Sequence, residues 1–474
     1  MVTLIIHNRF AQITGLDRKL YRKLDQATSY LVAGHRFYKA FKKHQWDGRE
    51  HLLKFSKKNG VSIPSGLVYD VTKTLKSLGV EYKILDKRRR WHQKREIIWN
   101  DEKGLRPYQK RALKAWARAE VPGLGTLKMP IRSGKTRTAA KIIQKTGVPA
   151  LFIVPSKMLL HQTVQTLREC MPNEPIGVVG DGMYDVQFIT AATVQTLSRM
   201  RSTNDPKYKD LLKAFDLIVG DEIHHYRGSG EWYKIFYDFN VAFRVGLSAT
   251  IFPDSETEVE HGIMWAKGLF GGICFEVPVS ELIDNGYLMR QNVEMYRIKE
   301  PMELLKSKWS QTLLNRGIIE NKYRNKKIVE LAKRETDLGA RVLIVTNRLN
   351  HIAILSEMLD EIGIDHRVIT GKNSSEERND LIEGFVAGRY LCILGTVLRE
   401  GVDIPEVEVV INAEGWKDEK NAIQRQRNLT IAEGKKRALM IDFVDEFNQY
   451  FFKHSMARLK TYQSESAFLV QVVE

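Results

Sequence analysis

Cysteine is scarce in this chain. Only 3 of its 474 residues are cysteines, and they lie far apart at Cys170, Cys274 and Cys392, with no C-x-x-C pair among them. Isolated thiols of this kind exclude a zinc ribbon and argue against a disulfide framework. We therefore expect a protein of a reducing, cytoplasmic compartment that carries no structural zinc.

Long apolar runs are also missing. No stretch approaches the roughly 20 consecutive apolar residues that a membrane helix needs. The apolar segment Val2–Ile6 is short and is followed by Arg9 rather than by a cleavage site, so we do not expect a signal peptide. The sequence thus predicts no membrane partner.

Acidic residues are outnumbered by basic ones. Asp and Glu total 57 against 74 Lys and Arg, which gives a formal net charge of +17. The excess is concentrated, because residues 1–103 hold 23 basic and 10 acidic residues, a net charge of +13. Since cations bind phosphates and release counterions, this charge favours nucleic acid as a partner. The candidate contacts are the clustered cations Lys42, Lys43, Lys57, Lys58, Lys87, Arg88, Arg89 and Arg90.

Aromatic residues lie among these cations, and an aromatic face can stack on an unpaired base. The six that we single out are Phe37, Tyr38, Phe41, Trp46, Phe55 and Trp91. The simpler interpretation places them in a hydrophobic core beneath a solvated, charged face. We expect a core position for most of these rings, while the concentrated charge still favours nucleic acid.

The pattern of apolar segments changes near Leu105. Before it, short strands and helices punctuated by glycine and proline predict a small α+β domain. After it, apolar strands alternate with amphipathic helices in two successive blocks, which predicts two parallel α/β sheets in tandem. The expected boundaries are 1–100 for the basic domain, 101–290 for the first α/β domain, 291–320 for a linker, 321–449 for the second α/β domain and 450–474 for a C-terminal tail.

A phosphate-binding loop is predicted at residues 129–136. The sequence Met-Pro-Ile-Arg-Ser-Gly-Lys-Thr follows an apolar strand and precedes a helix, which is the context that such a loop requires. Lys135 is expected to reach the β- and γ-phosphates of a nucleotide, and the Thr136 hydroxyl to bind Mg²⁺. Loop amides and the helix N-terminus would hold the phosphates, with Arg132, Ser133 and Gly134 as further contacts. The usual first glycine is absent, and a chance surface sequence is the alternative.

Two carboxylates follow the apolar segment 217–220. Asp221 and Glu222 then lie at the carboxyl end of a strand, where open α/β sheets bind their ligands. Asp221 is expected to hold Mg²⁺ through water, and Glu222 to orient and deprotonate a water that attacks the γ-phosphate. Alone, such a pair is often a helix cap. Together with the phosphate loop upstream, it predicts a site of ATP hydrolysis.

The order of these motifs resembles that of the superfamily 2 helicases of the DExH type. Residues 105–109 resemble the adenine-reading element, with Arg106 and Gln109 as its contacts, and residues 248–250 resemble the Ser-Ala-Thr motif that links hydrolysis to domain movement. Residues 395–405 match the fifth helicase motif very well, which implies nucleotide contacts by Gly401 and Asp403. The resemblance also implies strand contacts by Pro155, Ser156, Gln162, Thr193, Gln195, Asn347, Arg348, Thr370, Gly371 and Thr396.

The sixth motif departs from the family pattern. It usually reads Q-x-x-G-R-x-x-R and supplies an arginine to the γ-phosphate, whereas residues 424–430 here read Gln-Arg-Gln-Arg-Asn-Leu-Thr. Arg427 and Arg425 are both candidates for this arginine, and Arg427 is preferred. The resemblance covers Leu105 to about Asp445. It implies two tandem RecA-like domains that bind ATP and Mg²⁺.

The N-terminal residues indicate which group of these helicases the chain resembles. Trp-Asp-Gly-Arg at 46–49 and Ile-Pro-Ser-Gly-Leu at 63–67 are similar to the small domain that precedes the motor in phage UvsW-type helicases. That family implies an ATP-dependent DNA helicase that regresses forks, migrates branches and processes Holliday junctions in the cytoplasm of a bacterial host. We expect the N-terminal domain to supply DNA affinity and to be separable from a folded motor. The alternatives are an RNA helicase, a restriction-type translocase subunit and a catalytically silent DNA-binding protein.

Overall fold

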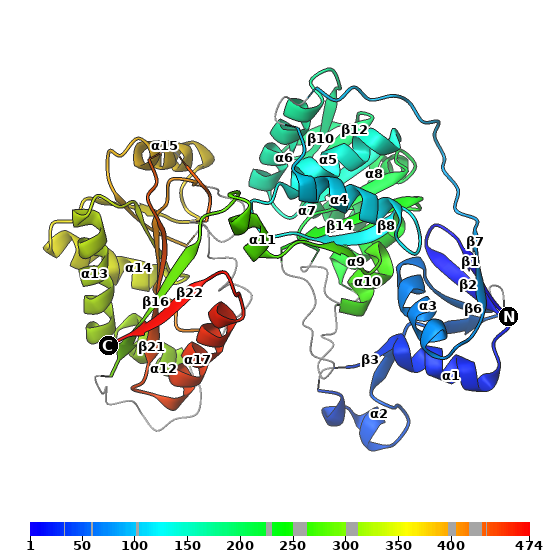
Figure 1. Ribbon diagram of the computed structural model, residues 1–474, viewed down its shortest axis with the longest axis horizontal. Coiled ribbons are helices and arrows are strands. Elements are labelled where there is room, and N and C mark those ends of the chain that lie inside the picture. Colours follow the sequence, from blue (N-terminus) through cyan, green and yellow to red (C-terminus); the bar gives the residue numbers. More distant parts are fainter. Residues whose placement is uncertain are drawn as a thin grey trace. The chain divides into compact units, whose positions relative to one another are not determined.

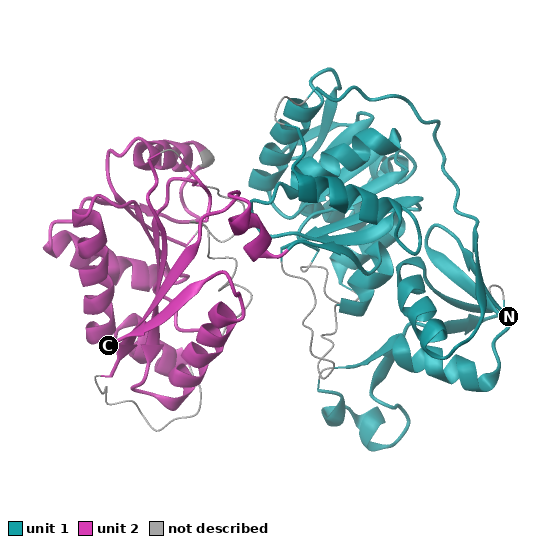
Figure 2. Ribbon diagram, in the orientation of Figure 1, with its two compact units in different colours: residues 1–277 teal, residues 278–474 magenta. Residues whose placement is uncertain are grey.

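The computed structural model describes residues 1–474 except 33, 58–59, 101–103, 224–229, 250–262, 300–310, 397–403, 417–428 and 433. The chain forms two compact units, Met1–Val277 and Pro278–Glu474 (Figure 2). In the described part of the chain, no helix combines the length and the apolar character that a membrane span requires.

The first unit begins with a five-stranded sheet. Its members in chain order are β1 (Val2–Ile6), β2 (Phe10–Thr14), β5 (Lys54–Ser56), β6 (Gly60–Pro64) and β7 (Tyr82–Asp86). They lie in the order β5-β6-β2-β1-β7, with β1 antiparallel to β2 and parallel to β7 (Figure 1). The side chains of β1 alternate in burial, and its inner face shares a core with Val68, Val71 and Leu75 of helix α3 (Val68–Ser77).

The remaining elements of this N-terminal block are short. They are α1 (Arg18–Ala27), a ribbon of β3 (Ser29–Leu31) and β4 (Arg49–His51), and the single turn α2 (Lys39–Lys42). This part of the chain buries few of the aromatic residues that the sequence places there. Phe37, Tyr38, Phe55 and Trp91 are 83%, 53%, 70% and 54% exposed. The expectation of a core position is therefore wrong for these four rings. Phe37 and Tyr38 lie next to the single turn α2, Phe55 lies on the edge strand β5, and Trp91 lies in the segment after β7.

An eight-stranded sheet forms the rest of the first unit. Its strands are β8 (Leu124–Lys128), β9 (Ala150–Val154), β10 (Ile176–Gly180), β11 (Met183–Asp185), β12 (Ile189–Thr193), β13 (Leu217–Gly220), β14 (Phe243–Ser248) and β15 (Ile273–Glu276). The order is β11-β10-β12-β9-β13-β14-β8-β15, and every pairing is parallel except that of β11. Its helices are α4 (Pro107–Ala117), α5 (Lys135–Thr146), α6 (Lys157–Cys170), α7 (Val194–Ser202), α8 (Pro206–Leu211), α9 (Glu231–Asp238) and α10 (Ile263–Phe270).

The two sheets of the first unit share one hydrophobic core. Leu67 and Val71 of the N-terminal block cluster with Leu124 and Met264 of the eight-stranded part. The fully buried Arg244 links them further, since its Nη1 donates to Leu269 O at 2.7 Å and its Nη2 to Ser65 Oγ at 3.0 Å. The block 1–100 therefore packs within one compact unit together with the eight-stranded sheet, where the sequence predicts a domain of its own.

The second unit contains a seven-stranded sheet that is parallel throughout. Its strands are β16 (Gln291–Ile298), β17 (Val342–Val345), β18 (His366–Ile369), β19 (Cys392–Gly395), β20 (Val409–Asn412), β21 (Ala438–Asp445) and β22 (Leu469–Val473), in the order β18-β19-β17-β20-β21-β16-β22. Its helices include α11 (Val279–Asp284), α12 (Gln311–Leu314), α13 (Lys322–Asp337), α14 (Leu349–Glu361), α15 (Ser375–Val386) and α17 (Gln449–Gln463). Both sheets are thus parallel α/β layers, as the sequence predicts.

Two expected boundaries differ from the structure. Residues 291–298, expected to begin a linker, form β16, which pairs with both β21 and β22 and buries Val293 and Met295. Residues 450–474, expected to be a tail, contain most of α17 and all of β22. Both segments belong to the second unit, since β16 pairs with β21 and with β22, and α17 packs against β21.

Candidate functional site

The phosphate loop connects β8 to α5. Its first residue, Met129, is buried, and its amide donates to Ser248 O at 2.9 Å, so a core side chain stands where the usual glycine is absent. Ser133 is fully buried, and its hydroxyl donates to Pro130 O at 2.6 Å across the loop. Gly134 has a φ of +76°, which a residue with a side chain rarely adopts. The loop therefore holds its curved shape by its own contacts, immediately before the helix N-terminus.

The segment 106–109 braces this loop. Tyr108 donates its hydroxyl hydrogen to Ser133 O at 2.7 Å, and Gln109 Nε2 donates to the same carbonyl at 3.0 Å and to Gly134 O at 3.4 Å. Gln109 Oε1 accepts from the amide of Arg106 at 2.9 Å, and the Gln109 side chain is 2% exposed. In this arrangement the amide of Gln109 holds the loop. Its expected contact with adenine, like that of Arg106, stays a prediction.

Lys135 and Glu222 form an ion pair at the carboxyl edge of the sheet. They follow β8 and β13, which flank β14, and Lys135 Nζ lies 2.9 Å from Glu222 Oε1. Burial by itself would lower the pKa of Lys135, but the carboxylates of Glu222 and Asp221 outweigh it and hold this pKa above its ordinary value. Lys135 is therefore a fixed positive charge at the loop.

The acidic pair is held in an unusual backbone geometry. Glu222 has a φ of +47°, a region that residues with side chains rarely occupy, and its amide donates to Asp221 Oδ1 at 2.9 Å. The amide of Asp221 in turn donates to Ile153 O at 3.0 Å. These bonds fix both carboxylates beside the phosphate loop.

The oxygen atoms at this edge suit Mg²⁺. The structure describes no group of 3 or more His, Cys, Asp or Glu side chains arranged as a metal cluster within its ranges. Mg²⁺ does not need one, because it binds through one or two carboxylates, substrate phosphates and water. Asp221, which is 5% exposed, and the half-buried Thr136 supply oxygens of the required kind.

The residues expected to contact a nucleic-acid strand in the first unit also lie at strand ends. Pro155 and Ser156 follow β9, Thr193 ends its neighbour β12, and Gln195 Nε2 donates to Pro155 O at 2.5 Å. Ser156 and Thr193 cap helices α6 and α7 through their side-chain oxygens, while Gln195 and Gln162 are exposed. The structure thus brings Pro155, Ser156, Thr193 and Gln195 together at the same edge as the phosphate loop, while Gln162 lies in the second turn of α6.

The corresponding residues of the second unit share an edge as well. Asn347 and Arg348 follow β17, Thr370 and Gly371 follow β18, and Thr396 follows β19, and these three strands are neighbours in the sheet. The Thr396 amide donates to Ile369 O at 3.1 Å, which joins two of these strand ends. Arg348 lies 5.8 Å from the ring of Trp416. Gly401, Asp403, Arg425, Arg427, Lys58 and Thr250 lie outside the described residues.

Two family profiles match this chain in tandem. Residues 102–253 match the family described as "Type III restriction enzyme, res subunit", and residues 323–427 match the "Helicase conserved C-terminal domain". The first covers β8 to β14 of the eight-stranded sheet, and the second covers β17 to β20 of the seven-stranded sheet. The chain belongs to the superfamily 2 helicases. It is an ATP-hydrolysing enzyme.

Known relatives of this helicase act on nucleic acids. The ATP-dependent DNA helicase uvsW of Enterobacteria phage T4 is 22% identical over 490 residues, which cover 95% of this chain and 94% of that protein. The DNA 3'-5' translocase XPB2 of Sulfurisphaera tokodaii is 26% identical over 380 residues, which cover 73% and 82%. A solved structure, the DNA-bound Type ISP restriction-modification enzyme LlaBIII, shares the fold with a TM-score of 0.59 at 15% identity, over 85% of this chain and 36% of that chain.

The basic N-terminal residues of the helicase differ in their surroundings. Lys42, Lys43, Lys57, Lys87, Arg89 and Arg90 are exposed. Arg88 instead turns inward: its Nη1 donates to Ala242 O at 2.8 Å and its Nη2 to Pro122 O at 2.7 Å, and its side chain is 7% exposed. The expectation that Arg88 contacts nucleic acid is therefore wrong, because its guanidinium binds the backbone of the adjoining sheet.

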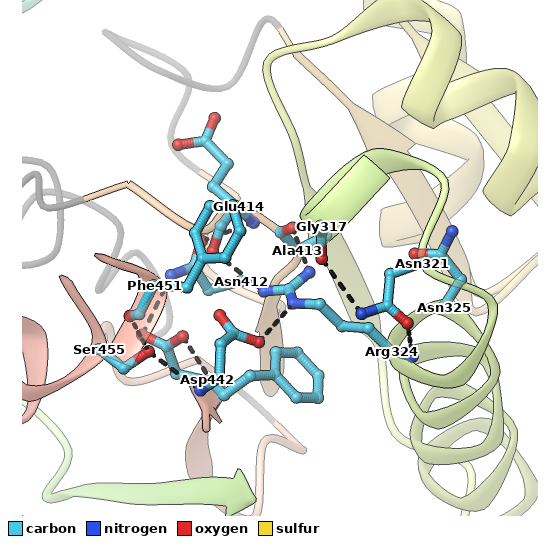
Figure 3. Close-up of polar contacts among 12 residues, drawn as sticks. Gly317, Asn321, Arg324, Asn325, Asn412, Ala413, Glu414, Asp442, Phe451 and Ser455 are labelled. Atoms are coloured by element: carbon cyan, nitrogen blue, oxygen red, sulfur yellow. Dashed lines mark hydrogen bonds and ion pairs between the residues drawn. The ribbon is translucent and has the colours of Figure 1, made fainter. Parts of the chain in front are cut away.

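Sequence reasoning missed a buried polar network in the second unit of the helicase (Figure 3). Arg324 of α13 donates from Nε to Asp445 Oδ1 at 2.9 Å, from Nη1 to Ala413 O at 2.6 Å and from Nη2 to Glu414 O at 3.1 Å. Arg458 of α17 binds Asp442 in the same way, with Nε at 2.9 Å from Oδ2. In the sequence, Arg324 is one of several basic residues of an amphipathic helix, a pattern typical of solvent-facing residues.

Proposed function

We propose that this helicase remodels branched DNA by fork regression, branch migration and Holliday-junction processing. The observation that supports this most is the shared core of the first unit, which joins the block of net charge +13 to the ATPase sheet. Exposed cations such as Lys87 and Arg89 then move as one body with the motor, so they can hold one arm of a substrate while the motor acts on another. The phage T4 DNA helicase matches this block as well as the motor.

The residues at the edge of the first sheet divide the work of hydrolysis between them. Lys135 and the loop amides bind the β- and γ-phosphates, and an incoming polyphosphate competes with Glu222 for the lysine. Glu222 orients the attacking water and accepts its proton. Asp221 and Thr136 hold Mg²⁺, which neutralises charge on the transferred phosphoryl group.

The second unit contributes strand contacts and an arginine. Asn347, Arg348, Thr370 and Thr396 bind the backbone of the translocated strand, and Arg427, or else Arg425, stabilises the transition state of hydrolysis.

Phage relatives support a site of action in the cytoplasm of a bacterial host. RNA is the alternative substrate, since a putative ATP-dependent RNA helicase of Acanthamoeba polyphaga mimivirus is 25% identical over 370 residues.

Matched nucleic-acid substrates test this proposal. The purified chain is given ATP with a fork, a four-way junction and a linear duplex of equal length, each made in DNA and in RNA. We expect strand exchange on the DNA fork and junction at rates well above those on the linear duplex. Equal rates on all three shapes would contradict a role in branch remodelling, and a preference for the RNA set would reassign the substrate.

Two variants of the ATPase site test the residue roles. Lys135→Ala is expected to abolish ATP binding and turnover, whereas Glu222→Gln keeps nucleotide binding and loses turnover by about 10²–10⁴-fold, because an amide cannot accept the proton. Phosphate release and equilibrium nucleotide binding are the measurements. Lys128→Ala is the matched control, since Lys128 ends β8 directly before the loop, but its side chain pairs with Glu276 of β15. If Glu222→Gln loses binding together with turnover, Glu222 is structural.

A further inference from the structure

A basic groove of about 580 Å³ lies where the N-terminal block meets the eight-stranded sheet. This volume is within the range of small-ligand pockets, about 300–1,000 Å³. The groove is lined by three cations and three aromatic or imidazole rings, namely Arg9, Lys87, Arg89, His7, Phe10 and Trp91. None of its described lining residues is acidic.

The walls of the groove are fixed by hydrogen bonds to backbone. Asn8 is 5% exposed, and its Nδ2 donates to Arg89 O and Asn240 O, both at 2.9 Å, while its Oδ1 accepts from the Arg89 amide at 2.9 Å. Arg9 Nη2 donates to Asp238 O, and its guanidinium lies 5.4 Å from the Tyr237 ring. The turn between β1 and β2 is thereby pinned to the adjoining sheet, so the groove is preformed.

The chemistry of the groove suits a phosphate next to a base. Two nearby acids pair with cations, Asp238 with Arg201 at 2.7 Å and Asp86 with Arg88 at 2.6 Å, and the third, Asp216, is fully buried and accepts from backbone amides. Trp91 donates from Nε1 to Asn240 O at 3.0 Å, yet its side chain remains half exposed and offers a ring face at a fixed position. Exposed aromatic faces stack on unpaired bases, and neighbouring cations bind the connecting phosphates.

The groove lies at the opposite edge of the sheet from the ATPase residues. The amides of Trp91 and His92 each donate to Asp216 at 2.8 Å, and Asp216 directly precedes β13, while Asn240 precedes β14. Lys135 and Glu222 follow the carboxyl ends of their strands. Strands of 4–6 residues separate the two edges, which at a rise of about 3.3 Å per residue corresponds to roughly 13–20 Å. A nucleotide in the groove is therefore a different nucleotide from those that contact the strand-end motifs.

The geometry points to a second nucleic-acid site: the groove binds an unpaired nucleotide of a single-stranded arm that the motor does not hold. This inference rests on the proposed function, because the branched substrate is the source of that arm. Branched substrates supply such an arm beside the translocated strand, whereas a blunt linear duplex does not. Selection of branched substrates thus follows from occupation of two sites on one rigid unit.

Binding measured without ATP tests the site independently of the ATPase. Full-length Lys87→Gln/Arg89→Gln and Trp91→Leu variants are titrated against labelled oligothymidylate, oligouridylate, a fork with one single-stranded arm, and a blunt duplex. We expect affinity for the single strands and the fork to fall about tenfold with Trp91→Leu. For the charge variant, the salt slope should flatten by about 0.7 per lost phosphate contact. Lys326→Gln/Lys333→Gln is the control, since it removes the same charge from an exposed face of α13.

Further binding measurements distinguish a stacking role of Trp91 from a structural role and from a purely electrostatic one. Trp91→Phe keeps an aromatic face without the bond to Asn240, so it should restore most of the binding; a loss equal to that of Trp91→Leu would show a structural role and overturn the proposal. An equal loss on the blunt duplex would show a general electrostatic effect and also overturn it. A comparison of the two oligonucleotides shows whether the arm is DNA or RNA. These binding measurements use no ATP, so they test the groove even if the ATPase assays contradict the proposed function.

Discussion

The contacts of Gln109 in the structure differ from the contact that its motif predicts. The motif predicts a contact with adenine, but the buried amide of Gln109 donates to the carbonyls of Ser133 and Gly134 and accepts from Arg106. A Cβ atom on Gly134 would approach Gln109 Nε2 to 2.5 Å, so the glutamine also closes off the loop on that side. Gln109 therefore sets the shape of the phosphate loop.

Replacement of Gln109 should weaken the binding of every nucleoside triphosphate to the same extent. Gln109→Ala removes the two bonds from its amide to the loop, while Tyr108 still donates to Ser133 O and Thr138 to Gly134 O. At about 0.5–1.5 kcal/mol per bond, we expect nucleotide affinity to fall roughly tenfold. Equilibrium binding of ATP and GTP is the measurement, with Gln165→Ala as the control because Gln165 is exposed and pairs with Glu169 on α6. A loss confined to ATP would show instead that Gln109 reads the adenine.

His351 is a buried neutral histidine in the second unit. Its Nδ1 lies 3.1 Å from Thr346 Oγ1 and its Nε2 lies 3.0 Å from Asn325 Oδ1. Burial lowers the pKa of His351 from 6.5 to about 3, and the positive charge of Arg324 contributes to the shift. Between about pH 3 and pH 6.5, His351 is therefore mostly neutral in the folded protein, whereas the same side chain is protonated in the unfolded chain.

The pH dependence of stability follows from this difference. Below about pH 6.5 the unfolded state binds a proton that the folded state does not, so stability falls by up to about 1.4 kcal/mol per pH unit until the pKa of the folded state is reached. Urea unfolding from about pH 7 to about pH 5.5 measures this slope. His351→Gln should be less stable at neutral pH and should flatten the slope, whereas the exposed His44→Gln should leave the slope unchanged. An unchanged slope in His351→Gln would show that other groups carry the dependence.

Helix α13 joins several strand ends of the second unit through its first turns. Arg324 reaches the end of β20 through Ala413 O (Figure 3) and β21 through Asp445. Asn325 reaches Thr346, beyond β17, through His351. Both Arg324 and Asp445 have fully buried side chains. Through Ala413 O and Glu414 O, this helix fixes the residues that directly follow β20.

Loss of one member of this buried pair should be costly. Arg324→Met leaves Asp445 as an uncompensated buried charge, and we expect a destabilisation of about 3–5 kcal/mol. The double variant Arg324→Met/Asp445→Leu removes both charges and should recover much of that loss. Denaturant unfolding is the measurement. Lys326→Met, on the exposed face of the same helix, should change stability by less than about 0.5 kcal/mol. A double variant no more stable than the single one would show that the contacts of Arg324 with backbone dominate.

The first unit behaves as one body in which the N-terminal block completes the fold of the ATPase sheet. Gly66 packs so closely that a Cβ atom there would lie 2.1 Å from Lys267 O of α10. Ile97 is buried, and its carbonyl accepts from Gln144 Nε2 of α5 at 2.9 Å. The segment that follows β7 thus seals part of the eight-stranded layer as well as linking the two sheets (Figure 1).

Deletion of residues 1–100 should therefore unfold the ATPase sheet rather than release an active motor. The deletion uncovers Leu124 and Met264 and removes Ser65, one of the partners of the buried Arg244. Circular dichroism and thermal unfolding of the shortened chain are the measurements, and we expect loss of the cooperative transition of the first unit. The full-length Lys87→Gln/Arg89→Gln variant should unfold like the parent chain. A shortened chain that unfolds cooperatively and hydrolyses ATP would restore the view of a separable domain.

Local sequence by itself determined the elements and the strand-end motifs. Alternation of apolar strands with helices predicts the two parallel sheets, because each strand and helix is specified by its own periodicity. The phosphate loop and the Asp221–Glu222 pair are readable for the same reason, since their signals lie within a few adjacent residues. The catalytic and binding roles assigned to those residues remain predictions.

Only the tertiary structure decided which distant side chains meet. Arg324 and Asp445 are separated by 121 positions, and Asn8 and Asn240, which bound the basic groove, by 232. Arg88 turns inward although its neighbours in the same basic run are exposed. No spacing encodes these contacts, because they depend on which strands become neighbours. An order such as β13-β14-β8 follows from the packing of the whole chain, not from any single segment.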